Sequence, residues 1–339
     1  MLEENYTVPI FLKTGIRPVK PKISVVICTH NPKMHYLSRV LDALKRQTLA
    51  VEEWELLLVD NVSDSDWYAE VDMSWHPNHS YIREEQLGVI HARLRGMKEF
   101  SADLLVFVDD DNLIYPDYLE TALRISYNYP QLGVWGGQSI AEFEEAPPEW
   151  TKPYWVWLAI REFDHDRIST TFSSQVHVIT AGGCYRRNVA DAYLDLATRD
   201  HRRALLGRKG SRLLCREDID LCYSAYDVGL GVGLFTSLKL KHLMPPNRLS
   251  EDYLIRLVSS DKYSELLLLY IRGEMEKIKY WKHLFRVALF PIPWLLEPTA
   301  WMMSSRDRRF RFNERRASLE SMIDIFRLQQ SEITEEMHT

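Results

Sequence analysis

An apolar run that ends in three consecutive carboxylates constrains this chain more than any other feature. Residues 104–108 (LLVFV) are followed at once by Asp109, Asp110 and Asp111. A short apolar run of this kind is typical of a strand buried on both faces of a parallel sheet. Adjacent carboxylates repel one another unless a cation or hydrogen-bond donors compensate them. The run therefore predicts an acidic site at the carboxyl end of a buried strand, where α/β sheets bind their ligands.

The acidic site suits a divalent cation. Carboxylate oxygens are hard ligands that favour Mg²⁺ or Mn²⁺, and these ions usually bind phosphate oxygens as well. We expect an enzyme for a metal–diphosphate substrate, with Asp111 on the metal and Asp109 on the ribose or the metal's water shell. The alternative is a solvated acidic turn before the helix expected after Pro116. Three acids directly after a buried strand favour the functional interpretation.

Strand-like and helical segments alternate along the first part of the chain, which predicts a mostly parallel α/β sheet with right-handed crossovers. Strands are expected at residues 23–28, 54–59, 81–82 and 104–108, and helices at 37–44, 88–100 and after Pro116. Residues 133–183 break this pattern with aromatics, Gly and Pro, and we interpret them as an inserted substrate-binding region. Later segments are expected as a helix at 218–227, a strand at 232–240 and helices beyond Pro246.

The 339 residues are enough for one large α/β domain and a helical appendage. We expect an N-terminal extension at 1–21, a catalytic domain at 22–250, a helical C-terminal region at 251–330 and a frayed polar tail at 331–339. Within the catalytic domain, a donor half is expected at about 22–112 and an acceptor half at about 133–250.

Composition excludes several classes of protein. The formal net charge of −6 gives no argument for a nucleic-acid partner, and none is expected. The four cysteines form no CxxC pair, which excludes the usual zinc patterns and fits a reducing cytosol. No leader-like apolar segment opens the chain, and no stretch reaches the roughly 20 apolar residues of a spanning helix. We therefore expect a cytoplasmic protein.

Polar residues also follow the first two predicted strands. Thr29, His30 and Asn31 follow the first strand, and Asp60 and Asn61 follow the second. In a doubly wound sheet these two strand ends are neighbours. Thr29 could then bind a base or ribose, and Asp60 could accept a hydrogen bond from a base N–H. Turn and capping chemistry is the alternative for each; their combination with the acidic site favours binding.

Two further candidates stay open on the residues alone. Glu217 and Asp218 open a predicted helix, where a carboxylate is often only an N-cap. A positioned carboxylate could instead deprotonate a sugar hydroxyl. His242 follows the strand expected at 232–240. A lone histidine is more often structural, although a neutral imidazole can complete a site begun by carboxylates.

Five sequence blocks together resemble glycosyltransferase family 2, the inverting enzymes with the GT-A fold. The blocks span about residues 22–250 and read SVVICTHNP, ELLLVDNVSDSD, LGVIHARLRGMKEFSADLLVFVDDDN, AGGCYRRNV and REDIDLCYSAYDVG with a later HLMPPNR. The resemblance implies a Rossmann-like sheet flanked by helices and a Mn²⁺- or Mg²⁺-dependent enzyme. It implies transfer from a nucleotide-diphosphate sugar, UDP-sugar favoured, to a hydroxyl of a glycan or lipid-linked acceptor in surface polysaccharide or glycolipid assembly.

The resemblance also implies roles for individual residues. Asp109, Asp111 and His242 would bind the metal, and Asp218, beside Glu217, would be the catalytic base. Contacts to the nucleotide-sugar would come from Thr29, His30, Asn31, Asp60, Asn61, Arg93, Asp109, Asp110, Gly182, Gly183 and Arg248. Two alternatives remain: a non-catalytic nucleotide-sugar-binding partner in a synthase complex, and a sugar nucleotidyltransferase. The first conflicts with the intact acids; the second needs a Gly-rich loop where THNPKMH has no Gly.

Aromatic and basic segments suggest contacts with the acceptor. Trp135, Trp150 and Trp155 are expected to stack on acceptor sugars, or else to form the core of an irregular insertion. Residues 285–316 combine a proline-broken apolar stretch with an arginine-rich run, a pattern that fits peripheral contact with the inner face of the cell membrane. The alternative is a helical appendage packed on the catalytic domain or on a second subunit of a homo-oligomer.

Overall fold

A nine-stranded sheet organises the chain in the computed structural model, which describes residues 20–172, 175–208, 213–275 and 304–336. The strand order is β3-β2-β1-β4-β8-β6-β9-β5, with β7 paired to β9. The strands are β1 (Ile23–Thr29), β2 (Trp54–Asn61), β3 (His79–Glu84), β4 (Leu104–Phe107), β5 (Asn112–Ile114), β6 (Leu132–Phe143), β7 (Arg167–Ser169), β8 (Cys184–Arg186) and β9 (Gly231–Met244). The α-helices are α1 (Met34–Lys45), α2 (Val89–Glu99), α3 (Tyr118–Asn128), α4 (Arg187–Arg199), α5 (Glu217–Asp227), α6 (Glu251–Ile271) and α9 (Ser305–Glu336).

The first four predicted strands form a wholly parallel half of the sheet. β1 pairs in parallel with β2 and β4, and β2 pairs in parallel with β3. The register places Thr29 opposite Asp60. Because parallel strands share one carboxyl edge, the loops after β1, β2 and β4 emerge side by side. The predicted positions of these strands are confirmed.

The other half of the sheet is mixed. β8 runs antiparallel to β4 and β6, and β9 pairs in parallel with β6 and antiparallel with β5 and β7. The mostly parallel α/β sheet is therefore confirmed, with antiparallel pairings added in this half. The expectation that residues 133–183 are an irregular insertion is wrong at its start, because β6 covers Leu132–Phe143. The Gly136-Gly137 pair interrupts the apolar pattern at a register shift, and a Cβ on Gly137 would lie 2.0 Å from the Leu238 carbonyl oxygen.

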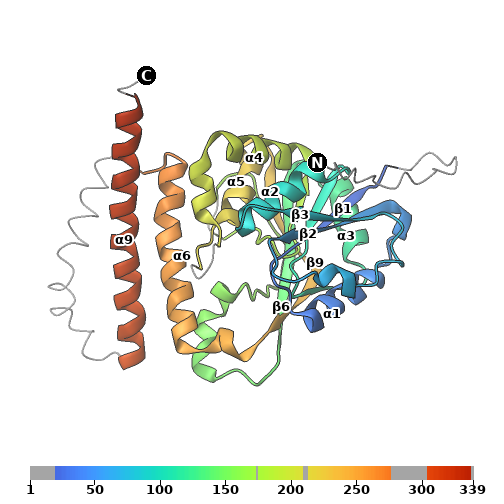
Figure 1. The fold of residues 1–339 in the computed structure, drawn as a ribbon, viewed down its shortest axis with the longest axis horizontal. Coiled ribbons are helices and arrows are strands. Elements are labelled where there is room, and N and C mark those ends of the chain that lie inside the picture. The colour runs from blue at the N-terminus through green and yellow to red at the C-terminus, as the bar shows by residue number, and fades with distance from the viewer. Residues whose placement is uncertain (1–19, 173–174, 209–212, 276–303, 337–339) are drawn as a thin grey trace, which may run out of the picture.

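Helices cover both faces of the sheet (Figure 1). One core packs α1 and α3 against the sheet through residues such as Leu37, Leu44 and Leu119. The other core packs α2, α4 and α5 against the opposite face, with Tyr193 and Leu221 among its buried residues. These helices are short because each must bury only one apolar stripe over the sheet. α1 follows the carboxyl end of β1 and α2 follows that of β3, whereas α4 begins at the opposite edge, where the Arg187 amide donates to the Asp103 carbonyl oxygen.

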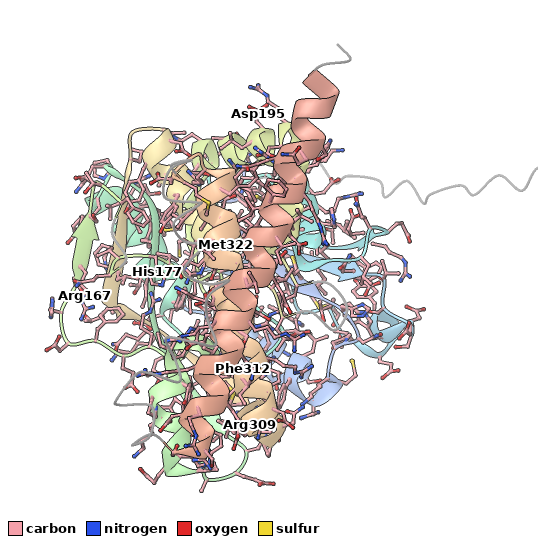
Figure 2. The ribbon with its side chains drawn as sticks, turned by 90° about the vertical axis from the view of Figure 1, so that its left-hand side faces the viewer. Arg167, His177, Asp195, Arg309, Phe312 and Met322 are labelled. Atoms are coloured by element: carbon pink, nitrogen blue, oxygen red, sulfur yellow. The ribbon has the colours of Figure 1, made fainter. Side chains whose placement is uncertain are left out.

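Two long helices follow the sheet and confirm the expectation of helices beyond Pro246. α6 and α9 lie side by side (Figure 1), and α9 runs along the outer side of the molecule (Figure 2). Met322 and Ile325 of α9 are buried against Leu267 and Leu268 of α6. The tail predicted to fray at 331–339 is instead helical as far as Glu336. Among the described residues, no helix combines the length and apolar character needed to cross a membrane.

Candidate active site

Asp111 is the most deeply placed acid of the turn after β4. Its Oδ2 lies 3.0 Å from Nη2 of Arg248 and 3.5 Å from Nε2 of His242. The antiparallel pairing of β5 with β9 sets His242 opposite Asn112 and so brings the imidazole to the turn. Burial opposes ionisation, but His242 and Arg248 hold the pKa of Asp111 well below its usual range. Asp111 is therefore an anion at neutral pH.

The other two acids of the turn have different surroundings. Asp110 accepts a hydrogen bond from the hydroxyl of Thr29 at the end of β1. Burial, with the neighbouring Asp111 charge, raises the pKa of Asp110 to about 7. Asp109 is half-exposed, and its carboxylate lies 3.5 Å from Nη2 of Arg93. The loops after β1 and β4 thus lie side by side, joined by the contact of Thr29 with Asp110.

Arg93 links the acidic turn to the second acidic motif. Its guanidinium is buried on α2 and forms an ion pair with Glu217 at the start of α5, while it also faces Asp109. Asp218, next in the chain, is half-buried. The acidic turn after β4 and the Glu217-Asp218 motif, which are far apart in sequence, therefore meet at the guanidinium of Arg93. Glu217 Oε2 is buried and has no hydrogen-bond partner in the part of the chain that the structure describes.

The buried Glu217 predicts a pH-dependent stability. Burial raises its pKa to about 7 from an ordinary 4.5, and Asp218 adds to the effect while Arg93 opposes it. The folded state then binds the extra proton, so this contribution to stability is present below pH 4.5 and is lost as the pH rises through 7.

We expect the unfolding free energy of the wild type, relative to Glu217→Gln, to fall as the pH rises from 5 to 7, because glutamine has no proton to lose. Denaturant unfolding of both proteins across this range is the measurement. A difference that stays constant with pH would contradict the buried, proton-holding state of Glu217.

The acidic turn can accept a divalent cation that arrives with a diphosphate. Within the described ranges no three His, Cys, Asp or Glu side chains converge as a metal site. Asp111 and His242 do converge, and the Nδ1 of His242 is buried with no hydrogen-bond partner among the described residues. In proteins, Mg²⁺ is usually bound by one or two protein ligands, and phosphate oxygens and water complete its coordination. The structure places Asp109 toward Arg93 instead, so its predicted role as a third metal ligand is not supported.

Asp60 and Asn61 are buried and hydrogen-bonded within the protein, so their predicted contact with the nucleotide is not supported. Asp60 is 0% exposed and accepts hydrogen bonds from Trp67 Nε1 at 2.9 Å and from Arg83 Nη1 at 2.7 Å. Asn61 accepts from the Gly88 amide at 2.8 Å, just before α2 begins. Both side chains hold the neighbouring loops in place.

The residues after β1 do reach the surface of this edge. His30 is exposed, with its Nδ1 2.7 Å from the Asn61 carbonyl oxygen, and Asn31 exchanges two hydrogen bonds of 2.8 Å with Asp64. Val62 has a left-handed backbone with φ of 57°. A β-branched residue rarely adopts this conformation, and such strain gathers at ligand-binding loops. The role of His30 and Asn31 in nucleotide binding stays a prediction.

Gly182 and Gly183 are required by the protein's own packing. Gly182 has φ of 72°, and a Cβ there would lie 2.5 Å from the Tyr118 hydroxyl oxygen. A Cβ on Gly183 would lie 2.6 Å from the Tyr185 hydroxyl oxygen. Both glycines are buried, so the prediction that they let the backbone approach the sugar is not supported.

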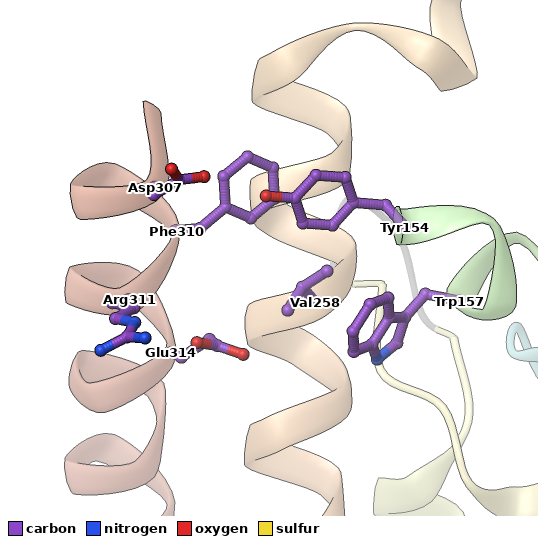
Figure 3. Close-up of a pocket in the computed structure, with 7 residues that line it drawn as sticks. All are labelled: Tyr154, Trp157, Val258, Asp307, Phe310, Arg311 and Glu314. Atoms are coloured by element: carbon purple, nitrogen blue, oxygen red, sulfur yellow. The ribbon is translucent and has the colours of Figure 1, made fainter. Parts of the chain in front are cut away.

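Trp135 is fully buried, whereas the other aromatics of the segment are partly buried against neighbouring elements. Trp135 is 0% exposed within the sheet, so its predicted acceptor contact is wrong. Trp150 lies under the Arg306 guanidinium, and Trp155 packs on Phe143. Figure 3 shows the neighbouring aromatics of η3 (Glu149–Leu158) against α6 and α9, around a cavity of about 290 Å³ lined by Tyr154, Trp157, Val258, Asp307, Phe310, Arg311 and Glu314. The alternative of a core for the insertion fits this arrangement.

Two arginines near the site were not predicted. The exposed Arg208 lies close enough to lower the pKa of both Asp111 and Glu217, so it is placed to meet an anionic ligand. The basic run GRKGSR was the available signal. Arg161 donates to the His177 carbonyl oxygen at 2.5 Å; burial lowers its pKa, and the nearby Asp218 opposes that shift. No sequence pattern marked Arg161.

Comparisons with known proteins identify the family of this chain. The family model described as Glycosyl transferase family 2 matches residues 24–194, half of the chain. A glucosyl-dolichyl phosphate glucuronosyltransferase from Haloferax volcanii is 25% identical over 78% of this chain and 84% of its own length. A validoxylamine A glucosyltransferase from Streptomyces hygroscopicus subsp. jinggangensis is 37% identical, over 30% of this chain and a quarter of its own length.

A solved structure shares the fold. The crystal structure of S. aureus TarS residues 1–349 in complex with UDP-GlcNAc aligns with a TM-score of 0.50 at 14% identity, over 88% of this chain and 90% of that one. The fold is therefore GT-A-like. The chain belongs to glycosyltransferase family 2 and is a nucleotide-sugar glycosyltransferase. This assignment removes the nucleotidyltransferase alternative.

Proposed function

We propose that this enzyme transfers a sugar, with inversion and with the help of Mn²⁺ or Mg²⁺, from a UDP-sugar to a hydroxyl of a glycan or lipid-linked acceptor. The observation that carries the proposal is the position of Arg93 between Asp109 and Glu217. It joins the expected diphosphate site to the expected catalytic base, Asp218, within one edge of the sheet. A donor and a hydroxyl nucleophile could therefore meet there.

Each group then has a chemical task. Asp111 and His242 would hold the cation, which would supply Lewis-acid stabilisation of the diphosphate as it leaves. Arg93 and Arg248 bring positive charge to the same region. Asp218 removes the proton of the acceptor hydroxyl, which attacks the anomeric carbon from the face opposite the leaving group. One displacement inverts the configuration without a covalent enzyme intermediate.

The donor and acceptor classes rest on the relatives. UDP-GlcNAc is bound in the TarS structure, which supports a UDP-sugar donor here. The name of the Haloferax relative contains a dolichyl phosphate, which supports a lipid-linked acceptor in the assembly of surface glycans. Both the donor class and the acceptor class are inferred for this chain from similar proteins. The donor class comes from a protein that shares the fold.

The proposal includes peripheral membrane contact through residues 285–316. Residues 285–303 lie outside the described residues. In the described part of this segment, Arg306 and Arg309 pair with Glu251 of α6 at 3.1 and 2.7 Å. These two arginines therefore pin α9 to α6, and only the remaining basic residues would face lipid head groups.

The proposal predicts metal-dependent release of UDP. Purified protein with Mn²⁺ and a panel of UDP-sugars should release UDP from one of them, slowly to water and faster with a lipid-linked or glycan acceptor. Addition of EDTA should stop the release. Release at the same rate in EDTA would contradict metal dependence, and activity only with a GDP- or dTDP-sugar would replace the donor class.

A further inference from the structure

Arg216, the residue before the two acids of α5, has an unusual backbone. Its φ of 84° lies in the left-handed region. A residue with a Cβ persists in this conformation only when surrounding contacts enforce it, and such residues gather at active sites. The conformation sets the direction in which the chain enters α5. It therefore sets where Glu217 and Asp218 lie.

The contact that enforces this conformation comes from the C-terminal helices. Arg216 Nε and Nη2 donate to Oδ1 and Oδ2 of Asp261 on α6, at 2.7 and 2.9 Å. Both side chains are about four-fifths buried. A bidentate arginine–carboxylate pair fixes orientation as well as distance. The preceding amide, of Cys215, donates to Ser264 Oγ at 3.2 Å, so α6 holds this loop at two points.

The same carboxylate also holds the aromatic insertion. Trp157 Nε1 donates to Asp261 Oδ2 at 3.1 Å. Figure 3 shows Trp157 beside Val258, one turn before Asp261 on α6. Asp261 thus joins three parts of the chain: the loop before α5, the segment η3 and the appendage. Among the described residues, no other carboxylate accepts hydrogen bonds from both Trp157 and Arg216.

We infer that Asp261 is a positioning residue for the glycosyl transfer reaction. Through Arg216 it holds the left-handed turn that places Asp218 toward the acceptor hydroxyl, and through Trp157 it ties that turn to the acceptor half. The inference rests on the proposed role of Asp218 as the base. The helical appendage is on this account part of the catalytic apparatus and not only a covering.

The test uses four variants of the full chain and one control variant. Asp261→Asn removes the charge of the carboxylate, and Arg216→Lys keeps the positive charge without the bidentate fork. Arg216→Gly removes the Cβ and so adopts the left-handed conformation without the contact. The double variant Arg216→Gly/Asp261→Asn completes a cycle. Asp227→Asn is the matched control, because it removes another arginine–carboxylate pair, in which Nη1 of Arg272, just after α6, donates to both oxygens of Asp227 at the far end of α5.

We expect Asp261→Asn and Arg216→Lys to lower kcat by about 10- to 100-fold, with donor KM changed less than about twofold, as for a small misplacement of a catalytic group. In the Arg216→Gly background, loss of Asp261 should change kcat less than about twofold, since no strained conformation needs support. Asp227→Asn should keep wild-type kcat. Equal effects of Asp261→Asn in both backgrounds, or wild-type kcat in Asp261→Asn and Arg216→Lys, would overturn the inference.

Hydrogen exchange separates this inference from the proposed function. The Cys215 amide should exchange at least about tenfold faster in Asp261→Asn than in the wild type or Asp227→Asn. In Asp261→Asn the loop before α5 can open without breaking the ion pair of Arg216 with Asp261. This readout needs no turnover. Faster exchange in a protein that releases no UDP would retain the tether and reject the function. Unchanged exchange would reject the tether whatever the activity.

Discussion

Replacement of Asp218 by asparagine should lower sugar transfer by roughly 10²–10⁴-fold, the range for loss of a general base. The change keeps the size of the side chain and its place at the start of α5, but removes the group that takes the hydroxyl proton. Donor affinity should stay nearly unchanged, because the donor's diphosphate is expected at the turn after β4. Steady-state kinetics, with UDP affinity from calorimetry, measure the two effects separately.

The control for this variant is Asp227→Asn, an acid of the same helix that pairs with Arg272 away from the site. It should retain turnover within about twofold, as is usual for a partly exposed ion pair. Wild-type turnover in Asp218→Asn would remove Asp218 from the role of base. Glu217, buried on Arg93, would then be the next candidate.

Replacement of Asp111 by asparagine should abolish the effect of Mn²⁺ on donor binding and reduce kcat/KM by roughly 10³-fold or more, because a metal at the leaving group is worth several kcal/mol. Asp111 is the carboxylate that both His242 and Arg248 approach. Removal of the Asp111 charge leaves His242 and Arg248 without the carboxylate that they face. We therefore also expect a lower melting temperature for the free enzyme.

A matched variant distinguishes the lost metal from the lost stability. Asp103→Asn alters an exposed carboxylate at the opposite end of β4, where its partner is Lys20. It should keep both the melting temperature and the Mn²⁺ dependence of the wild type. If Asp111→Asn binds UDP with an undiminished response to Mn²⁺, the cation is held elsewhere.

The sequence was most informative where burial on both faces left continuous apolar runs. The runs that became β1, β2 and β4 predicted the parallel half of the sheet, and their carboxyl ends predicted one common site. β6 was not predicted because two glycines, at a register shift in its pairing with β9, interrupt its apolar pattern. The packing of α9 on α6 through Met322 and Ile325 is a tertiary effect that composition does not reveal.

The sequence indicated which acids follow the strands of the sheet, but it did not indicate which side chains these acids pair with. Asp60 resembles a ligand-binding acid in sequence, but the distant Arg83 and Trp67 occupy its carboxylate in the fold. The ion pair of Arg93 with Glu217 depends on α2 and α5 packing on the same face of the sheet. Trp135 was predicted to stack on an acceptor sugar, but it is buried inside the sheet. A single sequence does not reveal that position.

A thermal-shift panel tests the central claim most directly. The protein would be heated with UDP, GDP, dTDP or CMP, each with Mn²⁺ and with EDTA, since a ligand that binds only the native state raises the melting temperature. The account predicts stabilisation by UDP with Mn²⁺ that EDTA removes and that Asp111→Asn lacks. No shift with any nucleotide, or a UDP shift that is equal in EDTA, would contradict a metal–diphosphate site at the turn after β4.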